Sequence, residues 1–436
     1  MLAPGYLWGA QGVSFYAGHP GRVALLPWKH HLPWLFIAAA AVAVAVMAGV
    51  QRPGQGEVPA GIRASVPLGG DLIAFWTGAR ILADDGGPTE LYDRPRVLAE
   101  LSRAFPERPP LYRLAYPPPV YQATSALLPL GYRWAAALQV VAMALLFGLG
   151  ALAFTESCPT LAKRRLAAWA LLAAGPATVM TAVTGQLSGV WFVLLGGAVL
   201  AWSRGRRMGA GVLLGLLCAK PTLAAPVALA LLIAGQGWAL LGFALGGALL
   251  LVASLAVGGI GPWWAYLEMM RDTPDLTQRM WLHPARQFTL RTLLALPARG
   301  GGLAAPLGWA GVALGLGLCA AVAPRAWRAA RHPSTAMLGL GLALSAALLA
   351  APHLFDYDLG FHALGLAAGV VLLLVGEPMR PRLGWFLSIG AYLAPLGYPA
   401  ARWLGLGAGT LVLLAWVIWL DREVSEITRR RGAETA

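Results

Sequence analysis

The residues of this chain that could do chemistry are a small set of polar side chains in a strongly apolar sequence. They comprise one acid that begins an aromatic-rich segment, a group of cationic or titratable side chains, and several polar residues: Asp71; Lys220, Arg286, Arg291 and His353; Tyr116, Gln186, Gln287, Asp356 and Asp358. Polar groups at membrane depth are costly and by default mark a functional path. An acid can accept a proton, and cations can hold an anionic group. A site with one acid and several cations is therefore the physical hypothesis.

The composition places these residues in a membrane protein. Of the 436 residues, 58% are hydrophobic and only 12% are charged, whereas typical soluble domains are about 25% charged. The apolar residues form blocks of roughly 16 to 23 residues between short Arg-rich or Gly/Pro-rich stretches, the pattern that a bilayer requires of spanning helices. We therefore expect an all-α polytopic membrane protein.

The apolar blocks predict a bundle of about 11–12 transmembrane helices. The predicted spans are 33–50, 134–155, 166–184, 187–202, 208–235, 237–259, 304–323, 334–352, 358–376, 384–399 and 403–420. Lys220-Pro221 divides the block 208–235 into pieces of about 18 and 23 Å, each too short to cross a bilayer. We interpret this block as a broken hairpin with Lys220 at its tip.

The distribution of Lys and Arg predicts the orientation. With the N-terminus inside, the Lys- and Arg-containing loops face the cytoplasm, as the positive-inside rule expects: 156–165, 203–207, 324–333, 377–383 and the tail 421–436. A cytoplasmic segment 1–32 then precedes a single transmembrane domain 33–420 with extracytoplasmic loops 51–133 and 260–303. The candidate residues all fall on the extracytoplasmic side. We expect a multi-pass protein of the inner (plasma) membrane, with a site facing the periplasm or exterior.

Amphipathic helices are expected in both long loops. In the first loop, Leu72, Phe75, Trp76, Ala79 and Leu82 have helical spacing, which predicts a short amphipathic helix on the membrane surface. The second loop combines aromatic residues with Arg and Asp, a mixture suited to the headgroup level: Trp263, Trp264, Tyr266 and Trp281.

Several other classes of function are not expected. The formal net charge of +14 does not indicate nucleic-acid binding, because basic residues such as Arg164 and Arg206 lie between apolar blocks instead of on one face. Cys158, Cys218 and Cys319 are an odd number at wide spacing, so neither a disulfide framework nor a thiolate metal site is expected. Residues 1–32 lack the features of a removable signal peptide, so we expect the first helix to act as an uncleaved insertion signal.

A series of short motifs resembles glycosyltransferase family 87 of the GT-C superfamily. The motifs are Gly70-Asp71 before an aromatic-rich helix, Leu91-Tyr92-Asp93, Tyr116-Pro117-Pro118, Gly185-Gln186, Lys220-Pro221, and Pro352-His353 with Tyr357-Asp358. They extend over residues 65–365. The chain departs from the family pattern at Leu187, where Asn is frequent, and at Phe288, where Ser is common. The family includes polyprenyl-phosphate-mannose-dependent α-mannosyltransferases.

The resemblance implies an integral membrane glycosyltransferase with a GT-C-like bundle. It would transfer a sugar, with mannose as the first expectation, from a polyprenyl-phosphate donor to a lipid or glycan acceptor on the extracytoplasmic side. In the superfamily an acid of the first extracytoplasmic loop is the catalytic base, and Asp71 matches that position. The expected partners are membrane lipid, the donor and a glycolipid or glycan acceptor. No cofactor and no metal are expected, because nothing resembles the Asp-x-Asp signature of nucleotide-sugar enzymes.

The resemblance also suggests roles for the other polar residues. The leaving phosphate needs nearby positive charge, for which the candidates are Lys220, Arg286, Arg291 and His353. The candidates for contact with the sugar or acceptor are Gln186, Tyr116, Gln287, Asp356 and Asp358.

Each candidate also has a purely structural interpretation. Asp71 could cap a helix, and Lys220 could snorkel to the headgroups. Arg286 and Arg291 could bind anionic lipid heads, and His353 could cap a helix or pair with Asp356. Gln186 could join two helices, and Tyr116 with its prolines could shape a rigid re-entry into the membrane.

Two other classes of function compete with an enzyme. A secondary transporter or flippase would also have about a dozen helices, one of them broken, but such proteins commonly show two related halves. Here the two halves do not match, and the polar residues gather at one membrane face. A lipid-binding scaffold without turnover would need no ionised Asp71 near a cluster of cations.

Overall fold

A computed structural model gives the fold of this chain. It describes residues 69–84, 87–105, 114–173, 175–271, 286–298, 301–331, 335–375, 378–397, 401, 405 and 407–435. These residues are almost entirely helical, and the only β-pairing within them is a single bridge between Gln287 and Phe355. The prediction of an all-α polytopic membrane protein is confirmed. The predicted span 33–50, the segment 1–32 and Trp281 lie outside the described residues.

Four helical segments in the described part of the chain are long and apolar enough to cross a membrane. They are α6 (Gly131–Ser157) with the 3-10 turn before it, α13 (Gly237–Gly258), α17 (Ala304–Arg331), and the 3-10 helix η7 (Asp356–His362) followed by α19 (Ala363–Val375). Large apolar side chains on the outer faces of α6, α13 and α17 are exposed, for example Leu145, Leu249 and Leu314. Such faces suit contact with lipid chains.

Shorter helices fill the bundle between these long ones. They are α7 (Pro159–Ala162), α8 (Arg165–Ala173), α9 (Pro176–Thr184), α10 (Ser188–Ser203), α11 (Arg207–Gly215), α12 (Pro221–Ile233), α16 (Leu290–Ala295), α18 (Ala336–Ala350), α20 (Pro381–Leu393) and α22 (Ala408–Thr435). The most central is α18, in which every residue except Met337 and Leu338 is buried. Small residues allow close helix contacts, since a Cβ on Gly211 or Gly246 would meet a carbonyl of the facing helix.

Most predicted spans correspond to these helices, and the differences have local causes. The break at Lys220 is confirmed, because α11 and the 3-10 turn Leu216–Ala219 end there and α12 begins at Pro221. The predicted span 166–184 is two helices, because Pro176 begins α9 after Gly175. The predicted loop 324–333 is wrong for its first eight residues, because α17 continues through Pro324 to Arg331.

Two sets of contacts accompany the continuation of α17: Ala326, Ala329 and Ala330 are buried, and Arg325 forms an ion pair. Arg325 Nε lies 2.6 Å from Asp421 Oδ1 on α22, which itself extends helically through the predicted tail to Thr435. The two helices therefore stabilise each other beyond the apolar blocks.

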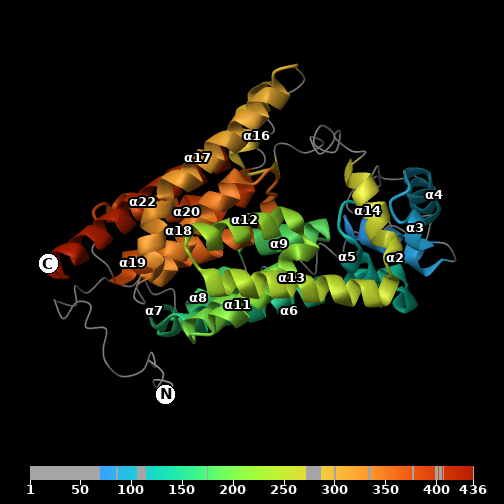
Figure 1. Cartoon of the computed structure of the whole chain (residues 1–436), viewed down its shortest axis with the longest axis horizontal. Coiled ribbons are helices and arrows are strands. Elements are labelled where there is room, and N and C mark those ends of the chain that lie inside the picture. Colours follow the sequence, from blue (N-terminus) through green and yellow to red (C-terminus); the bar gives the residue numbers. More distant parts are fainter. Residues whose placement is uncertain are drawn as a thin grey trace.

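The remaining helices gather at one end of the molecule, opposite the C-terminus (Figure 1). They are α2 (Leu72–Ala83), α3 (Gly87–Glu90), α4 (Arg94–Ala104), α5 (Pro118–Ser125) and α14 (Gly261–Arg271). The predicted apolar face of α2 is buried except at Leu82, which is partly buried, and Ile73 and Thr77 on the other side are buried as well. A helix covered on nearly all sides is not the one-sided surface helix that the spacing predicts. Arg80 of α2 and buried Glu100 of α4 form an ion pair of 2.8 Å that helps to hold it.

Candidate active site

Two glycine turns position the predicted acid, Asp71. The first turn, Gly69-Gly70-Asp71, precedes α2, and the second, Thr184-Gly185-Gln186, follows α9. The Asp71 N–H donates to the Thr184 carbonyl at 2.8 Å. Gly70 and Gly185 have φ of 52° and 66°, and a Cβ on either would meet a carbonyl of the other turn. Only glycine allows this approach of the two backbones, which brings Asp71 beside Gln186.

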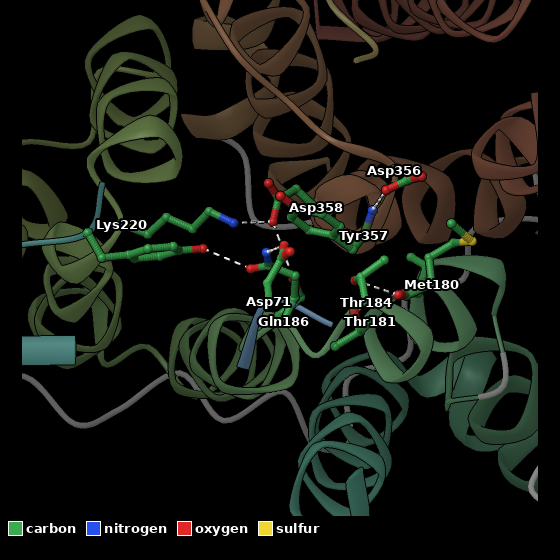
Figure 2. Close-up of polar contacts among 12 residues, drawn as sticks. Asp71, Met180, Thr181, Thr184, Gln186, Lys220, Asp356, Tyr357 and Asp358 are labelled. Atoms are coloured by element: carbon green, nitrogen blue, oxygen red, sulfur yellow. Dashed lines mark hydrogen bonds and ion pairs between the residues drawn. The ribbon is translucent and has the colours of Figure 1, made fainter. Parts of the chain in front are cut away.

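The side chains of Asp71, Gln186 and Tyr116 form a chain of hydrogen bonds. Figure 2 shows Asp71 and Gln186 beside the Lys220–Asp358 pair. The Gln186 amide Nε2 donates to Asp71 Oδ2, and the Tyr116 hydroxyl donates to Gln186 Oε1 at 3.0 Å. The Asp71 side chain makes no capping hydrogen bond to α2. Its carboxylate therefore points toward the polar cluster and not to its own helix.

Neighbouring residues hold these three hydrogen-bonded side chains in position. The Tyr92 hydroxyl donates to the Tyr116 carbonyl at 2.6 Å, and the Tyr116 N–H donates to the Tyr121 hydroxyl at 3.1 Å. On the other side, Gln139 Nε2 of α6 donates to the Gly185 carbonyl at 2.5 Å. Tyr92 and Tyr121 thus position Tyr116, whereas Gln139 positions the turn that carries Gln186.

Lys220 lies inside the bundle and forms an ion pair. Its Nζ donates to Asp358 Oδ1 at 2.6 Å, and Ser188 Oγ donates to the same oxygen at 3.3 Å. Lys220 is 5% exposed and Asp358 2%. The ammonium also lies 4.9 Å from the ring centre of Tyr357 and 5.6 Å from that of Tyr116. Lys220 does not snorkel to the headgroup level in this structure.

Arg286 forms a second ion pair beside the first. Its Nε and Nη2 donate to the two oxygens of Asp356 at 2.9 and 2.8 Å, and Asp356 is fully buried. Burial alone would lower the pKa of Arg286, but the hydrogen bonds and charge of Asp356 raise it, with smaller contributions from Tyr357 and Asp71. The guanidinium lies 5.6 Å from the centre of the Tyr357 ring. Tyr357 is therefore in contact with both cations, Lys220 and Arg286.

Gln287, Arg291 and His353 form a third cluster. His353 Nδ1 lies 3.3 Å from Gln287 Oε1, so it is the protonated nitrogen, and Nε2 accepts from Arg291 Nη1 at 3.4 Å. Burial, with a smaller effect of Arg291, lowers the pKa of His353 to about 4. The ring is neutral at pH 7 and can offer hydrogen bonds but no charge. His353 does not pair with Asp356, which is bound by Arg286.

The structure brings all the predicted site residues to one region of the fold. Tyr116 connects Asp71 and Gln186 to the Lys220–Asp358 pair, because its hydroxyl bonds to Gln186 and its ring lies beside Lys220. Tyr357 connects that pair to the Arg286–Asp356 pair, because its ring lies beside both cations. The chain neighbours Arg286 and Gln287 connect this network to the third cluster. Among the described residues, no group of three or more His, Cys, Asp or Glu side chains could hold a metal ion.

Sequence reasoning missed several residues of this network. Ser188, Gln139 and Tyr357 were not predicted as site residues, although Tyr357 lies in one of the motifs. Gln139 carried a readable signal, because it is a polar residue within the apolar block 134–155.

Comparison with known proteins gives one match. A sequence model of glycosyltransferase family 87 matches residues 114–352, more than half of the chain. The matched region contains Tyr116, Gln186, Lys220, Arg286, Gln287 and Arg291; it begins after Asp71 and ends just before His353. No curated protein and no solved structure gives a significant match. On its sequence match and its all-helical membrane fold, this chain belongs to glycosyltransferase family 87.

Proposed function

We propose that this membrane glycosyltransferase takes its sugar, mannose in the first instance, from a polyprenyl-phosphate donor and passes it to a lipid or glycan acceptor, with Asp71 as general base. The observation that carries the assignment of the base is a difference in exposure among three carboxylates. Asp356 and Asp358 are buried and ion-paired, whereas Asp71 is half-buried. Asp71 is thus the carboxylate of the three that a reactant can reach.

The proposed reaction is a displacement at the anomeric carbon. The acceptor hydroxyl oxygen forms a bond to this carbon as Asp71 removes the hydroxyl proton. The bond between the anomeric carbon and the phosphate oxygen breaks, and its electron pair leaves with the lipid phosphate. Gln186 would orient the carboxylate, because its amide donates to Asp71 while its carbonyl is held by Tyr116.

The leaving phosphate would be bound by the cations around Tyr357 and His353. Lys220 and Arg286 are held in position by their carboxylate partners and retain further N–H groups that could donate to phosphate oxygens. Arg291 lies in the adjoining cluster and would supply one charge, while neutral His353, whose two ring nitrogens are engaged by Gln287 and Arg291, would hold that guanidinium in position. Fixed donors where negative charge develops are an effective means of catalysis in a site that excludes water.

The proposed site faces the periplasm or the exterior of an inner (plasma) membrane. Asp71 directly precedes α2, which lies with α14 at one end of the molecule (Figure 1). Ser188, which contacts Asp358, begins α10, and the Arg-rich turn 204–207 follows the far end of that helix. The positive-inside rule assigns that turn to the cytoplasm. The reaction needs no metal or other cofactor in this proposal.

The test is a donor panel. Purified protein is incubated with polyprenyl-phosphate sugars or with nucleotide sugars, each with cell-envelope lipid extract, and products are identified by mass spectrometry. We expect transfer from polyprenyl-phosphate mannose, dependent on active protein and unaffected by a chelator. Transfer from a nucleotide sugar alone would contradict the proposed donor class.

A further inference from the structure

An apolar recess lies in the bundle away from the candidate active site. It lies between α10, α11, α12, α18 and α19. Its walls are apolar side chains from all five helices, including Trp202 and Met337. A wall of this kind excludes polar ligands, because it gives their hydrogen-bonding groups no partner.

Helix geometry places the recess in the opposite half of the bilayer from the site. Helix α10 begins at Ser188, which contacts Asp358, and Trp202 follows about 21 Å further along the helix at 1.5 Å per residue. Helix α12 begins beside Lys220, and Leu231 of the recess lies about 15 Å from that end. A bilayer core is about 30 Å thick, so the recess extends from near its middle toward the Arg-rich end.

Positive charge lies at that end of the recess. The guanidinium of Arg207 lies 5.9 Å from the centre of the Trp202 ring, which lines the recess. Arg204 and Arg206 belong to the same turn, and all three arginines are exposed. Basic residues at the membrane surface attract anionic lipid headgroups.

We propose that an anionic phospholipid of this leaflet binds here, with one acyl chain in the recess and its phosphate at Arg207. The apolar walls match the chain, and the arginines match the headgroup. The donor lipid fits the recess less well, because its phosphate would have to reach Lys220 and Arg291 at the other end of the bundle. The proposal does not depend on the proposed function.

Native mass spectrometry of the full-length protein in detergent tests this proposal. After delipidation, the protein is titrated with phosphatidylglycerol, phosphatidylcholine or polyprenyl phosphate. We expect one tightly bound phosphatidylglycerol, preferred over phosphatidylcholine. Arg207→Gln should weaken the preference for phosphatidylglycerol about fivefold, because one cation near an anionic membrane surface contributes about 1 kcal/mol to binding. Its matched control is Arg422→Gln, because Arg422 is an exposed arginine on α22, a helix that contributes no side chain to the recess.

A second variant tests occupation of the recess itself. Ala198, 2% exposed, lines the recess, so Ala198→Phe should abolish retention of the lipid. Leu249→Phe adds an aromatic ring on the exposed face of α13 and should leave retention unchanged. Equal binding of the two phospholipids, equal effects of the Arg207 and Arg422 variants, or displacement of phosphatidylglycerol by polyprenyl phosphate would overturn the proposal. The Arg207 variant changes an exposed side chain, so the test holds even where Ala198→Phe fails to fold.

Discussion

At the scale of single residues, Lys220 and Asp358 show how the site and the stability of the fold depend on each other. Both are buried, and the Nζ–Oδ1 distance is 2.6 Å. Removing one member of a buried pair leaves an uncompensated charge and typically costs about 3–5 kcal/mol. A loss of activity in a Lys220 variant therefore does not by itself identify a phosphate-binding role.

A double variant separates these effects. We expect Lys220→Met to lower the free energy of unfolding by about 3–5 kcal/mol, and Lys220→Met with Asp358→Asn to regain most of that stability. If Lys220 binds the donor phosphate, the stable double variant still uses donor poorly. Thermal unfolding in detergent and donor kinetics measure the two quantities. A double variant with wild-type donor kinetics would assign Lys220 to structure alone.

His353 gives a prediction about pH. Its pKa is about 4 in the folded chain because of burial and Arg291, against about 6.5 in an unfolded chain. Between these values only the unfolded state binds the proton, so stability is lost as pH falls from about 6.5 to 4. The expected loss is about 3 kcal/mol, at about 1.4 kcal/mol per pH unit.

The measurement compares thermal unfolding of wild type and His353→Gln over this pH range. The variant cannot titrate there, so its stability should depend less steeply on pH. If the stability of the two proteins depended on pH equally steeply, His353 would not be the group responsible for the loss of stability at low pH.

At the scale of elements, the contact between the two glycine turns determines where Asp71 lies. A Cβ at Gly185 would meet the Gly69 carbonyl and push the turns apart. Gly205 has a similar φ of 75°, but a Cβ there would meet nothing within 4 Å. Both Ala variants strain the backbone, and only one disturbs the site.

We therefore expect Gly185→Ala to lower activity about a hundredfold, as misplacement of reacting groups by about 1 Å can do. Gly205→Ala should stay within about twofold of wild type. Steady-state transfer rates at matched expression check this. Equal losses would assign the effect to backbone strain and not to the close approach.

The sequence predicted the positions of single helices better than the contacts between helices. The helix break at Lys220 could be predicted because Pro221 cannot continue a helix. The continuation of α17 past Pro324 could not, because its contacts there are with residues distant in sequence, such as Asp421, which is 96 residues from Arg325. Nor does local spacing show that α2 is covered on both sides, because its cover comes from α4 and α5. The two ion pairs likewise join residues 138 and 70 positions apart.

At the scale of the whole molecule, the orientation in the membrane decides which reactants can reach the site. Glu90 lies on α3 near the site end, and Gly205 lies in the Arg-rich turn. We expect Glu90→Cys to react with an impermeant thiol reagent on intact cells, and Gly205→Cys to react only after permeabilisation. Wild type, with its three native cysteines, provides the background. Reversed labelling would place the site in the cytoplasm.

Asp71 is the residue on which the proposed mechanism depends, and Asp71→Asn tests it most directly. Asn keeps the shape and removes the negative charge, so a general base should lose about 10²-fold to 10⁴-fold in turnover while expression and donor binding persist. The matched control is Asp93→Asn, because Asp93 caps α4 by accepting from the Arg96 N–H and should keep near wild-type activity. Retention of more than about a tenth of the activity by Asp71→Asn, a change of less than about 1.4 kcal/mol in barrier, would contradict its role as the base.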